Sequence, residues 1–107
     1  MAAARDVRAK GQRAQESSTS SWTFLSNHAH VLLAIAQQPE ARIREIAQQV
    51  GITERAVQRI IGELEAAGYL THQRNGRRNC YRVHPQQPLR HPIERHQRVA
   101  GLLALVE

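Results

Sequence analysis

Arginines are the side chains whose type and spacing most clearly suggest a chemistry in this sequence. The chain of 107 residues carries 15 lysines and arginines against 9 acidic residues, a formal net charge of +6. Lys10 is the only lysine, so the other cations are guanidinium groups, which bind phosphate oxygens and guanine edges through paired hydrogen bonds. The composition therefore favours an anionic partner, although basic tails and ribosomal proteins share these numbers.

Catalytic chemistry has few candidate residues here. Asp6 is the only aspartate, and the six glycines stand apart from one another, so the sequence contains no glycine-rich phosphate loop. No nucleophile is paired with a base at a recognisable spacing. We therefore expect a protein that is not an enzyme and that uses no cofactor.

The first helix is predicted over residues 26–38, where apolar residues recur at helical spacing until Pro39 ends the pattern. Trp22, Phe24 and Leu25 come directly before it. Because aromatic residues at the entrance of a helix belong to the core more often than to a binding site, we expect this cluster to pack across the helix.

Two shorter helices are predicted over residues 43–50 and 53–67, with a break at Gly51. A small residue in the first lets the two helices cross closely, and the glycine four positions later allows a sharp turn. Apolar residues in the second helix then close the shared core. This is the pattern of a helix-turn-helix. The positions that fit it are Ile46, Ala47, Val50, Gly51, Ile52, Val57 and Ile60.

The second of these helices has one apolar and one polar face when its residues are placed at 100° intervals. In a helix-turn-helix, the polar face of this helix enters the major groove of DNA. The apolar face consists of Val57, Ile60, Ile61 and Leu64. The polar face carries Glu54, Arg55, Gln58, Arg59 and Gly62.

A β-hairpin with a basic tip is predicted after the helices. Residues 70–74 and 77–83 flank Asn75-Gly76, which is a strong signal for a two-residue turn. The expected cross-strand pairs are Arg74 with Arg77, His72 with Asn79, and Leu70 with Tyr81. A helix-turn-helix followed by a basic hairpin is a winged helix. The predicted fold is therefore mainly α with a small β-hairpin, a winged helix-turn-helix with a C-terminal dimerisation helix.

The helix-turn-helix and the hairpin also carry a resemblance to a known family, in the stretch GITERAVQRIIGELEAAGYL and the hairpin that ends CYRV. This region, about residues 22–83, resembles winged helix-turn-helix transcriptional regulators of the MarR/ArsR kind. The chain is shorter than a typical MarR protein and lacks the cysteine-rich metal motif of many ArsR sensors. The resemblance implies a homodimer on a palindromic operator, with the recognition helix in the major groove. The DNA-binding residues expected by position are Thr53, Arg55, Gln58, Arg59, Arg74, Arg77 and Arg78.

The chain divides into three predicted regions. Residues 1–21 form a disordered basic tail, residues 22–84 the winged helix-turn-helix DNA-binding domain, and residues 85–107 a linker and a C-terminal dimerisation helix in which Pro92 occupies the first turn. Apolar residues on more than one face of that last helix indicate burial against a partner, so we expect a homodimer. The expected dimerisation residues are Ile93, His96, Val99, Leu102, Leu103 and Val106.

Simpler interpretations of the same residues remain open at this level. Arg55 and Arg59 would then be solvated and bridged to Glu54 or Glu63, and the wing arginines would only make the hairpin soluble. The histidines and Cys80 have possible metal or redox roles, but we expect ordinary structural roles and no metal site. Two other functions also stay open: a protein–protein interaction module, and a sensor that responds to a small molecule or a metal.

Location and partners follow from the same features. The sequence has one cysteine, no apolar run of membrane-spanning length and no signal peptide. We therefore expect a cytoplasmic protein with no membrane partner, associated with the bacterial nucleoid when bound to DNA. The expected partners are double-stranded DNA and a second copy of the chain, and the sequence identifies no small-molecule effector.

Overall fold

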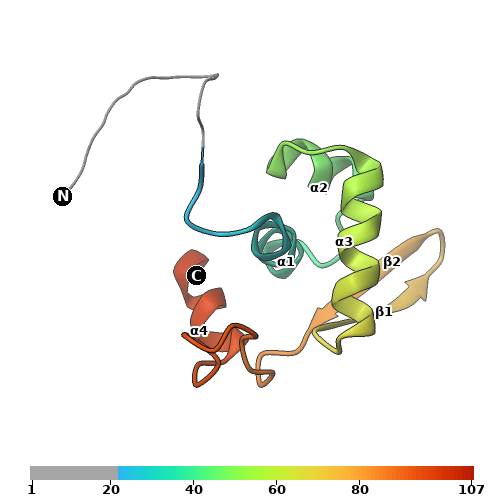
Figure 1. Cartoon of the computed structure of the whole chain (residues 1–107). Coiled ribbons are helices and arrows are strands. Elements are labelled where there is room, and N and C mark those ends of the chain that lie inside the picture. The colour runs from blue at the N-terminus through green and yellow to red at the C-terminus, as the bar shows by residue number, and fades with distance from the viewer. Residues whose placement is uncertain (1–21) are drawn as a thin grey trace.

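The computed structural model describes residues 22–107, in which α1 lies at the centre and a two-stranded hairpin forms one side (Figure 1). The predicted basic tail at residues 1–21 lies outside the described residues. The winged-helix fold is confirmed. The elements are α1 (Asn27–Gln37), α2 (Ile43–Val50), α3 (Glu54–Ala66), β1 (Leu70–Asn75), β2 (Arg78–Val83), α4 (Val99–Leu103) and the 3₁₀ helix η2 (Ala104–Val106). None of the helices described is long and apolar enough to cross a membrane.

The ends of the first three helices follow from local side chains. Ser26 and Thr53 cap α1 and α3, because their hydroxyl oxygens accept a backbone N–H of the first turn at 3.3 and 3.0 Å. Gly51 and Gly68 end α2 and α3 with φ values of 86° and 87°, which glycine adopts without steric cost. The predicted helix-turn-helix is therefore confirmed, with its turn at Gly51.

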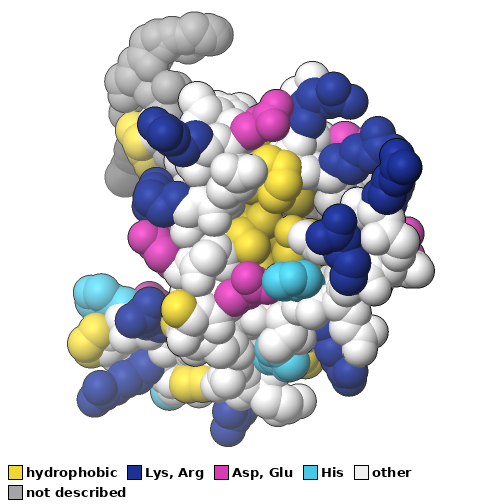
Figure 2. All heavy atoms as spheres, turned by 90° about the vertical axis from the view of Figure 1, so that its right-hand side faces the viewer, with side chains coloured by type: hydrophobic (Ala, Val, Ile, Leu, Met, Phe, Trp, Pro, Cys, Tyr) yellow, Lys and Arg dark blue, Asp and Glu magenta, His cyan; other side chains and the backbone are white. Residues whose placement is uncertain are grey.

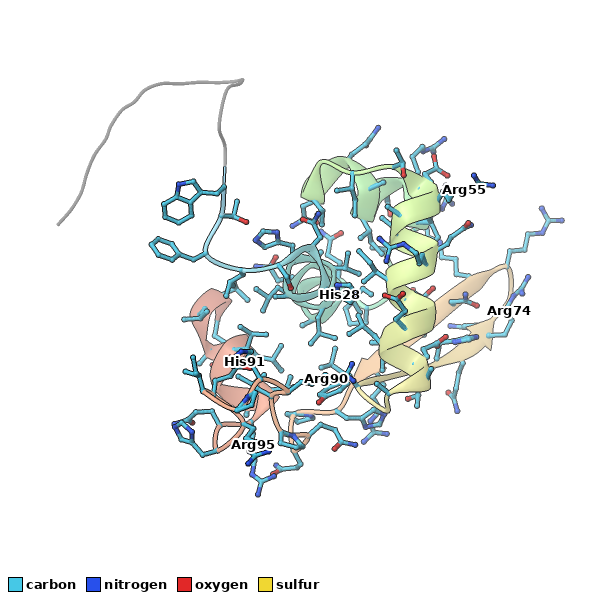
Figure 3. The ribbon with its side chains drawn as sticks, viewed as in Figure 1. His28, Arg55, Arg74, Arg90, His91 and Arg95 are labelled. Atoms are coloured by element: carbon cyan, nitrogen blue, oxygen red, sulfur yellow. The ribbon has the colours of Figure 1, made fainter. Side chains whose placement is uncertain are left out.

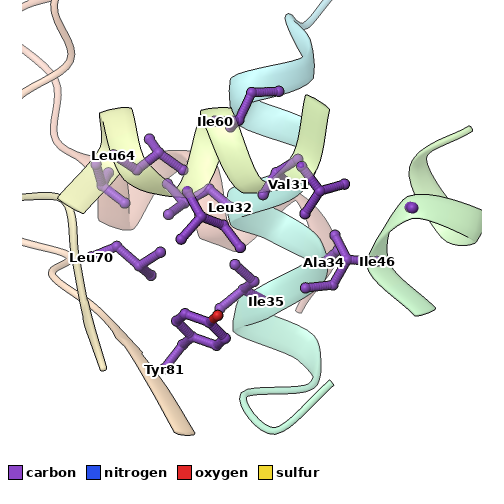
Figure 4. Close-up of a cluster of buried hydrophobic side chains, with 13 residues drawn as sticks. Val31, Leu32, Ala34, Ile35, Ile46, Ile60, Leu64, Leu70 and Tyr81 are labelled. Carbon is purple, nitrogen blue, oxygen red and sulfur yellow. The ribbon is translucent and has the colours of Figure 1, made fainter. Parts of the chain in front are cut away.

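One apolar core joins the four α-helices and both strands (Figure 4). α1 supplies its centre, since residues 31–35 are all buried. Leu70 of β1 and Tyr81 of β2 bring the hairpin into the core, and Val99 brings in α4. The remaining buried members come from α2 and α3: Ile46, Ala47, Val57, Ile60, Ile61 and Leu64.

The register of the hairpin differs by two residues from the predicted one. Leu70 pairs with Val83 instead of Tyr81, and the loop is Gly76-Arg77 instead of Asn75-Gly76. Gly76 has a φ of 66°, so the only glycine of the hairpin occupies the first loop position, where two-residue turns need a positive φ. Because the pairing shifts by an even number, Leu70 and Tyr81 still face the same side.

The predicted helix through Pro92 is wrong. α4 contains only five residues, and Ile93 and His96 lie before it in a turn. The Glu94 carboxylate accepts the His91 backbone N–H at 2.8 Å, and such side-chain bonds to the backbone compete with helix formation. Ile93 is consequently 80% exposed, outside any helical stripe.

The expectation that Trp22, Phe24 and Leu25 pack across α1 is also wrong. Trp22 and Phe24 are 73% and 92% exposed, and their rings contact each other edge to face with centroids 5.0 Å apart. Leu25 alone is half-buried. The reason is that α4 packs against α1, so the two aromatic residues remain outside the core.

Candidate nucleic-acid interface

The two predicted faces of α3 are separated in the structure as expected. Its four apolar residues are buried in the core, whereas Glu54, Arg55, Gln58 and Arg59 are exposed. Gly62 lies on the same exposed side, and among residues 22–107 no atom other than those of its chain neighbours and its own helix backbone lies within 4 Å of the position that a Cβ would occupy. The polar face is therefore open to a large ligand along its length.

The side chains of Thr53 and Arg55, at the start of α3, differ in whether they already form hydrogen bonds within the protein. The Thr53 hydroxyl oxygen accepts the Ala56 N–H at 3.0 Å, so its first role is that of a helix cap. The guanidinium of Arg55 has no hydrogen-bond partner among residues 22–107, which makes its donors available to a ligand.

Arg59 is held by a small network on the surface. Its Nη1 donates to both Glu63 carboxylate oxygens at 3.3 and 3.4 Å, and His28 Nε2 of α1 lies 2.7 Å from Glu63 Oε1. The hydrogen bond with His28 and, secondarily, the charge of Arg59 hold the pKa of Glu63 below its ordinary value. The bridged interpretation therefore holds for Arg59 and not for Arg55.

Three of the four hairpin arginines, those nearest the loop, occupy different environments. Arg74 Nε donates to the Gly76 carbonyl at 3.2 Å, and Arg78 Nη1 donates to the Glu40 carbonyl at 3.4 Å. Arg77 is exposed in the loop and has no hydrogen-bond partner within the described part of the chain. All three line one cleft of about 370 Å³ beside the start of α2.

Arg42 is a residue of this cleft that the sequence reasoning missed. It immediately precedes α2, and its backbone N–H donates to Glu45 Oε1 at 2.7 Å. Because 32 positions separate Arg42 from Arg74 in the sequence, no local pattern connects the two. Only the packing of the hairpin against the start of α2 brings them together.

The exposed face of α3 and the wing lie on one side of the molecule. Arg55 and Arg74 both project from the right-hand side in Figure 3, whereas Arg90, His91 and Arg95 lie at the lower end. Figure 2 shows this side directly: Lys and Arg side chains flank a central hydrophobic strip, with a few acidic side chains between them. Arg55 of α3 and Arg74 of the hairpin, two of the predicted DNA-binding residues, therefore project from the same side of the molecule.

A second hollow, of about 760 Å³, lies between α1, the end of α3 and the C-terminal region. It is mainly apolar, and the titratable side chains among its lining residues include His28, Glu63, Arg90 and Glu94. Glu63 thus borders the hollow and also binds Arg59 of the polar face. The apolar lining comes from Phe24, Leu25, Ala29, Leu32, Leu64, Ala67, Tyr69, Leu89, Val99 and Leu102.

His72 and His84 each contact a different partner within the protein. His72 Nδ1 pairs with Glu65, and His84 Nε2 lies 3.1 Å from Thr71 Oγ1. Within residues 22–107, no three histidine, cysteine or acidic side chains come close enough to hold a metal ion. Cys80 is a half-buried free thiol on β2.

The expected dimerisation residues do not form one surface. Val99 is only 1% exposed and belongs to the core of its own chain, and Leu102 and Leu103 pack partly against that core. The large hydrophobic side chains that remain exposed are Trp22, Phe24, Ile93, Leu105 and Val106.

Comparisons with known proteins agree with this architecture. A family model described as the MarR family matches residues 23–78, which is more than half of the chain. No curated protein sequence matches the chain significantly.

Two solved structures are similar to parts of the chain. The PcaV transcriptional regulator from Streptomyces coelicolor, in complex with its natural ligand, is 25% identical and aligns over 56% of this chain and 45% of its own, with a TM-score of 0.49. A mutant of ZitR from Lactococcus lactis is 21% identical and aligns over 64% of this chain and 48% of its own, also with a TM-score of 0.49. This chain therefore spans less than half the length of either.

Proposed function

Because the chain belongs to the MarR family, we propose that this protein is a transcriptional regulator that binds double-stranded DNA sequence-specifically as a homodimer. α3 enters the major groove, and the wing contacts the backbone or the adjacent minor groove. A dimer places its two recognition helices in half-sites one helical turn, about 34 Å, apart, so the operator is pseudo-palindromic.

The observation that carries this proposal is the common face of α3 and the wing. Residues 70–84 carry a net charge of +4, whereas residues 42–69 balance four arginines against four glutamates. The positive charge is therefore concentrated beside a neutral helix instead of being spread over the surface. That division suits a duplex whose backbone is bound by the wing and whose bases are contacted by the helix.

The proposed roles follow from how the residues are held. Arg55 has unoccupied donors and binds a guanine edge, and Gln58 is placed to bind adenine. Thr53 contacts the backbone through its hydroxyl hydrogen while its oxygen caps α3. Arg59 exchanges its exposed Glu63 partner for DNA, and the wing arginines Arg74, Arg77 and Arg78 supply affinity that falls with salt.

Selection of bound sequences from a random DNA pool is the test of this function. We expect enrichment of an inverted repeat, and a gel shift with that sequence at a salt concentration where a scrambled duplex does not bind. If the purified protein shifts no duplex even at low salt, the proposal is wrong, and a protein–protein interaction module becomes the better interpretation.

The homodimer requires a surface different from the stripe predicted from the sequence. Phe24, which contacts Trp22, lines the same hollow as Leu102 of α4, and Leu105 and Val106, which follow α4 in the sequence, are also exposed. Exposed aromatic and aliphatic side chains at one place are typical of a protein interface. We expect light scattering at micromolar concentration to give the mass of a dimer, and a monomer would contradict this part of the proposal.

An effector-responsive regulator is a second candidate, favoured by the hollow beside Glu63. A small molecule that bound there and engaged His28 would alter the Glu63–Arg59 pair and so the availability of Arg59. A thermal-shift screen of small molecules and metal ions, followed by DNA binding with each stabilising compound, tests this. A compound that stabilises the protein without changing its DNA affinity would argue against regulation through the hollow.

A further inference from the structure

The cleft between the start of α2 and the wing concentrates positive charge. Arg42 comes from one wall, and Arg74, Arg77 and Arg78 come from the other. Within the described part of the chain, Glu40 is the only acidic side chain that lines it. Four guanidinium groups repel one another at this density unless an anion lies among them, so the cleft has the composition of an anion-binding site.

The two walls of the cleft are joined by two hydrogen bonds to backbone carbonyls. The Tyr81 backbone N–H donates to the Pro39 carbonyl at 2.9 Å, and the Arg78 side chain donates through Nη1 to the Glu40 carbonyl at 3.4 Å. The Tyr81 side chain, 7% exposed, belongs to the core and supports the base of the cleft. The position of Arg42 relative to the wing is therefore set before any ligand binds, which lowers the entropic cost of binding.

The arginines retain donors for a ligand. Among residues 22–107, the guanidinium groups of Arg42 and Arg77 have no hydrogen-bond partner, and Arg74 uses only its Nε atom, in the bond to Gly76. Planar guanidinium groups with available paired donors match the oxygens of a phosphate group.

We propose that this cleft is a phosphate-binding site and that Arg42 is one of its ligands. The phosphate is a phosphodiester of the duplex backbone, bound beside the groove that the wing contacts. The inference rests on the proposed function, because the DNA supplies the phosphate. By binding this phosphate, Arg42 holds the helix-turn-helix and the wing on the same DNA strand and sets how deeply the wing enters its groove.

DNA affinity measured by fluorescence anisotropy over a series of salt concentrations tests the proposal. Arg42→Ala removes one phosphate contact, so the slope of log K against log salt should become less negative by about 0.9, equally for operator and scrambled duplexes. Arg44→Ala is the matched control, since Arg44 is exposed on the same helix and does not line the cleft. Glu40→Gln should act in the opposite direction and tighten binding.

Neutral backbone substitutions locate the phosphate itself. A methylphosphonate is placed at one operator position at a time, and the position that matters weakens binding of the wild-type protein but not of Arg42→Ala. If Arg42→Ala has the slope of the wild type and of Arg44→Ala, or if every methylphosphonate weakens it as much as the wild type, the proposal is overturned. Unchanged circular dichroism of Arg42→Ala confirms that the fold is intact.

Free phosphate has the same chemistry, and a further measurement distinguishes it. Chemical shifts of the arginine side chains are compared in inorganic phosphate and in chloride at equal ionic strength. If inorganic phosphate shifts the signals of the cleft arginines while Arg42→Ala leaves the salt slope of DNA binding unchanged, the ligand of the cleft is free phosphate and not the DNA backbone. If the wild-type protein binds no duplex, the proposed function fails and so does the backbone phosphate. If it binds DNA normally and only the Arg42 effects are missing, the cleft assignment alone fails.

Discussion

The two opposite ends of this molecule expose different chemistry although one core supports both. Beside α3 and the wing, Lys and Arg side chains flank a hydrophobic strip (Figure 2), and the four apolar side chains that α3 turns to the core are buried. Near the N-terminal segment and α4, large apolar side chains such as Phe24 and Leu105 remain exposed. A charged face suits a polyanion, whereas an apolar face suits another protein surface.

The difference indicates how the functions are divided. The charged face rests on the core, to which three helices and the hairpin each contribute buried residues. The apolar end depends on a five-residue helix and on a segment that makes few contacts with the core. We therefore expect the apolar end to gain most of its order from a second chain, and the charged face to be formed already in one chain.

Breaking the shared core should affect both ends together and gives the largest effect. Ile46 of α2 is completely buried between the helices, so Ile46→Ala should lower the free energy of unfolding by about 2–5 kcal/mol. Urea denaturation measures the loss, and both dimer mass and DNA binding should fall in parallel. A variant that loses only one of the two would show that the ends do not depend on one core.

Removing the exposed aromatic pair should affect the apolar end alone. The double substitution Trp22→Ser with Phe24→Ser removes apolar surface that a partner would cover. Burying a Phe side chain contributes about 1.5–3 kcal/mol of free energy, so the dimer dissociation constant should rise at least about tenfold. Analytical ultracentrifugation measures it, and Ile93→Ser is the control. An unchanged dissociation constant would exclude this pair from the interface.

Two arginine substitutions should divide the charged face into base-reading and backbone-binding parts. Arg55→Ala should reduce discrimination at one base pair by about 1–3 kcal/mol, whereas Arg77→Ala with Arg78→Ala should flatten the salt dependence for every duplex alike. Competition binding with single-base operator variants measures the first effect. Equal weakening of every duplex by Arg55→Ala would contradict base reading. Arg95→Ala, at the other end, serves as the control.

Replacing Gly62 should have a smaller effect, which concerns both stability and DNA binding. Its Cβ position is open, so Gly62→Ala should raise the free energy of unfolding by about 0.5–1 kcal/mol through the better helix propensity of alanine. If the DNA backbone also comes close to this position, the same variant binds DNA more weakly. Thermal unfolding and anisotropy separate the two effects, and a destabilised variant would contradict the open environment.

The smallest effect concerns the pH dependence of the Glu63 network. The pKa of Glu63 is lowered in the folded state, so its ionised form contributes stability above the ordinary value of about 4.5 and loses that contribution as the pH falls through the lowered value. Glu63→Gln should therefore be less stable than the wild type at neutral pH, and the difference should shrink on acidification. Glu40→Gln is the control, and a difference that grows in acid would contradict the assignment.

Features with a local cause were predicted correctly. The helix break predicted at Gly51 depends on that residue alone, because its positive φ ends α2 and glycine adopts this φ without steric cost. The division of α3 into two faces depends only on its own 3.6-residue repeat. The polar face of the helix could therefore be identified before any packing was known.

Features decided by competition between neighbouring bonds were predicted less well. The hairpin was placed correctly, but its register depended on which loop position took Gly76, and two adjacent turns compete for that glycine. The C-terminal stripe had helical spacing, but the turn closed by Glu94 interrupts it. Hydrophobic periodicity does not include such bonds, so it predicted a helix longer than the one that forms.

The sequence by itself determined the winged helix, the helix that presents Arg55 and Gln58, and the basic character of the hairpin, because each follows from interactions between residues close in the chain. Only the tertiary structure decided that Arg42 joins the wing arginines, that Val99 is buried, and that the aromatic pair is exposed. These three features depend on which elements pack together across the core. That packing is the sum of many weak contacts between residues distant in the sequence, and no short pattern encodes it.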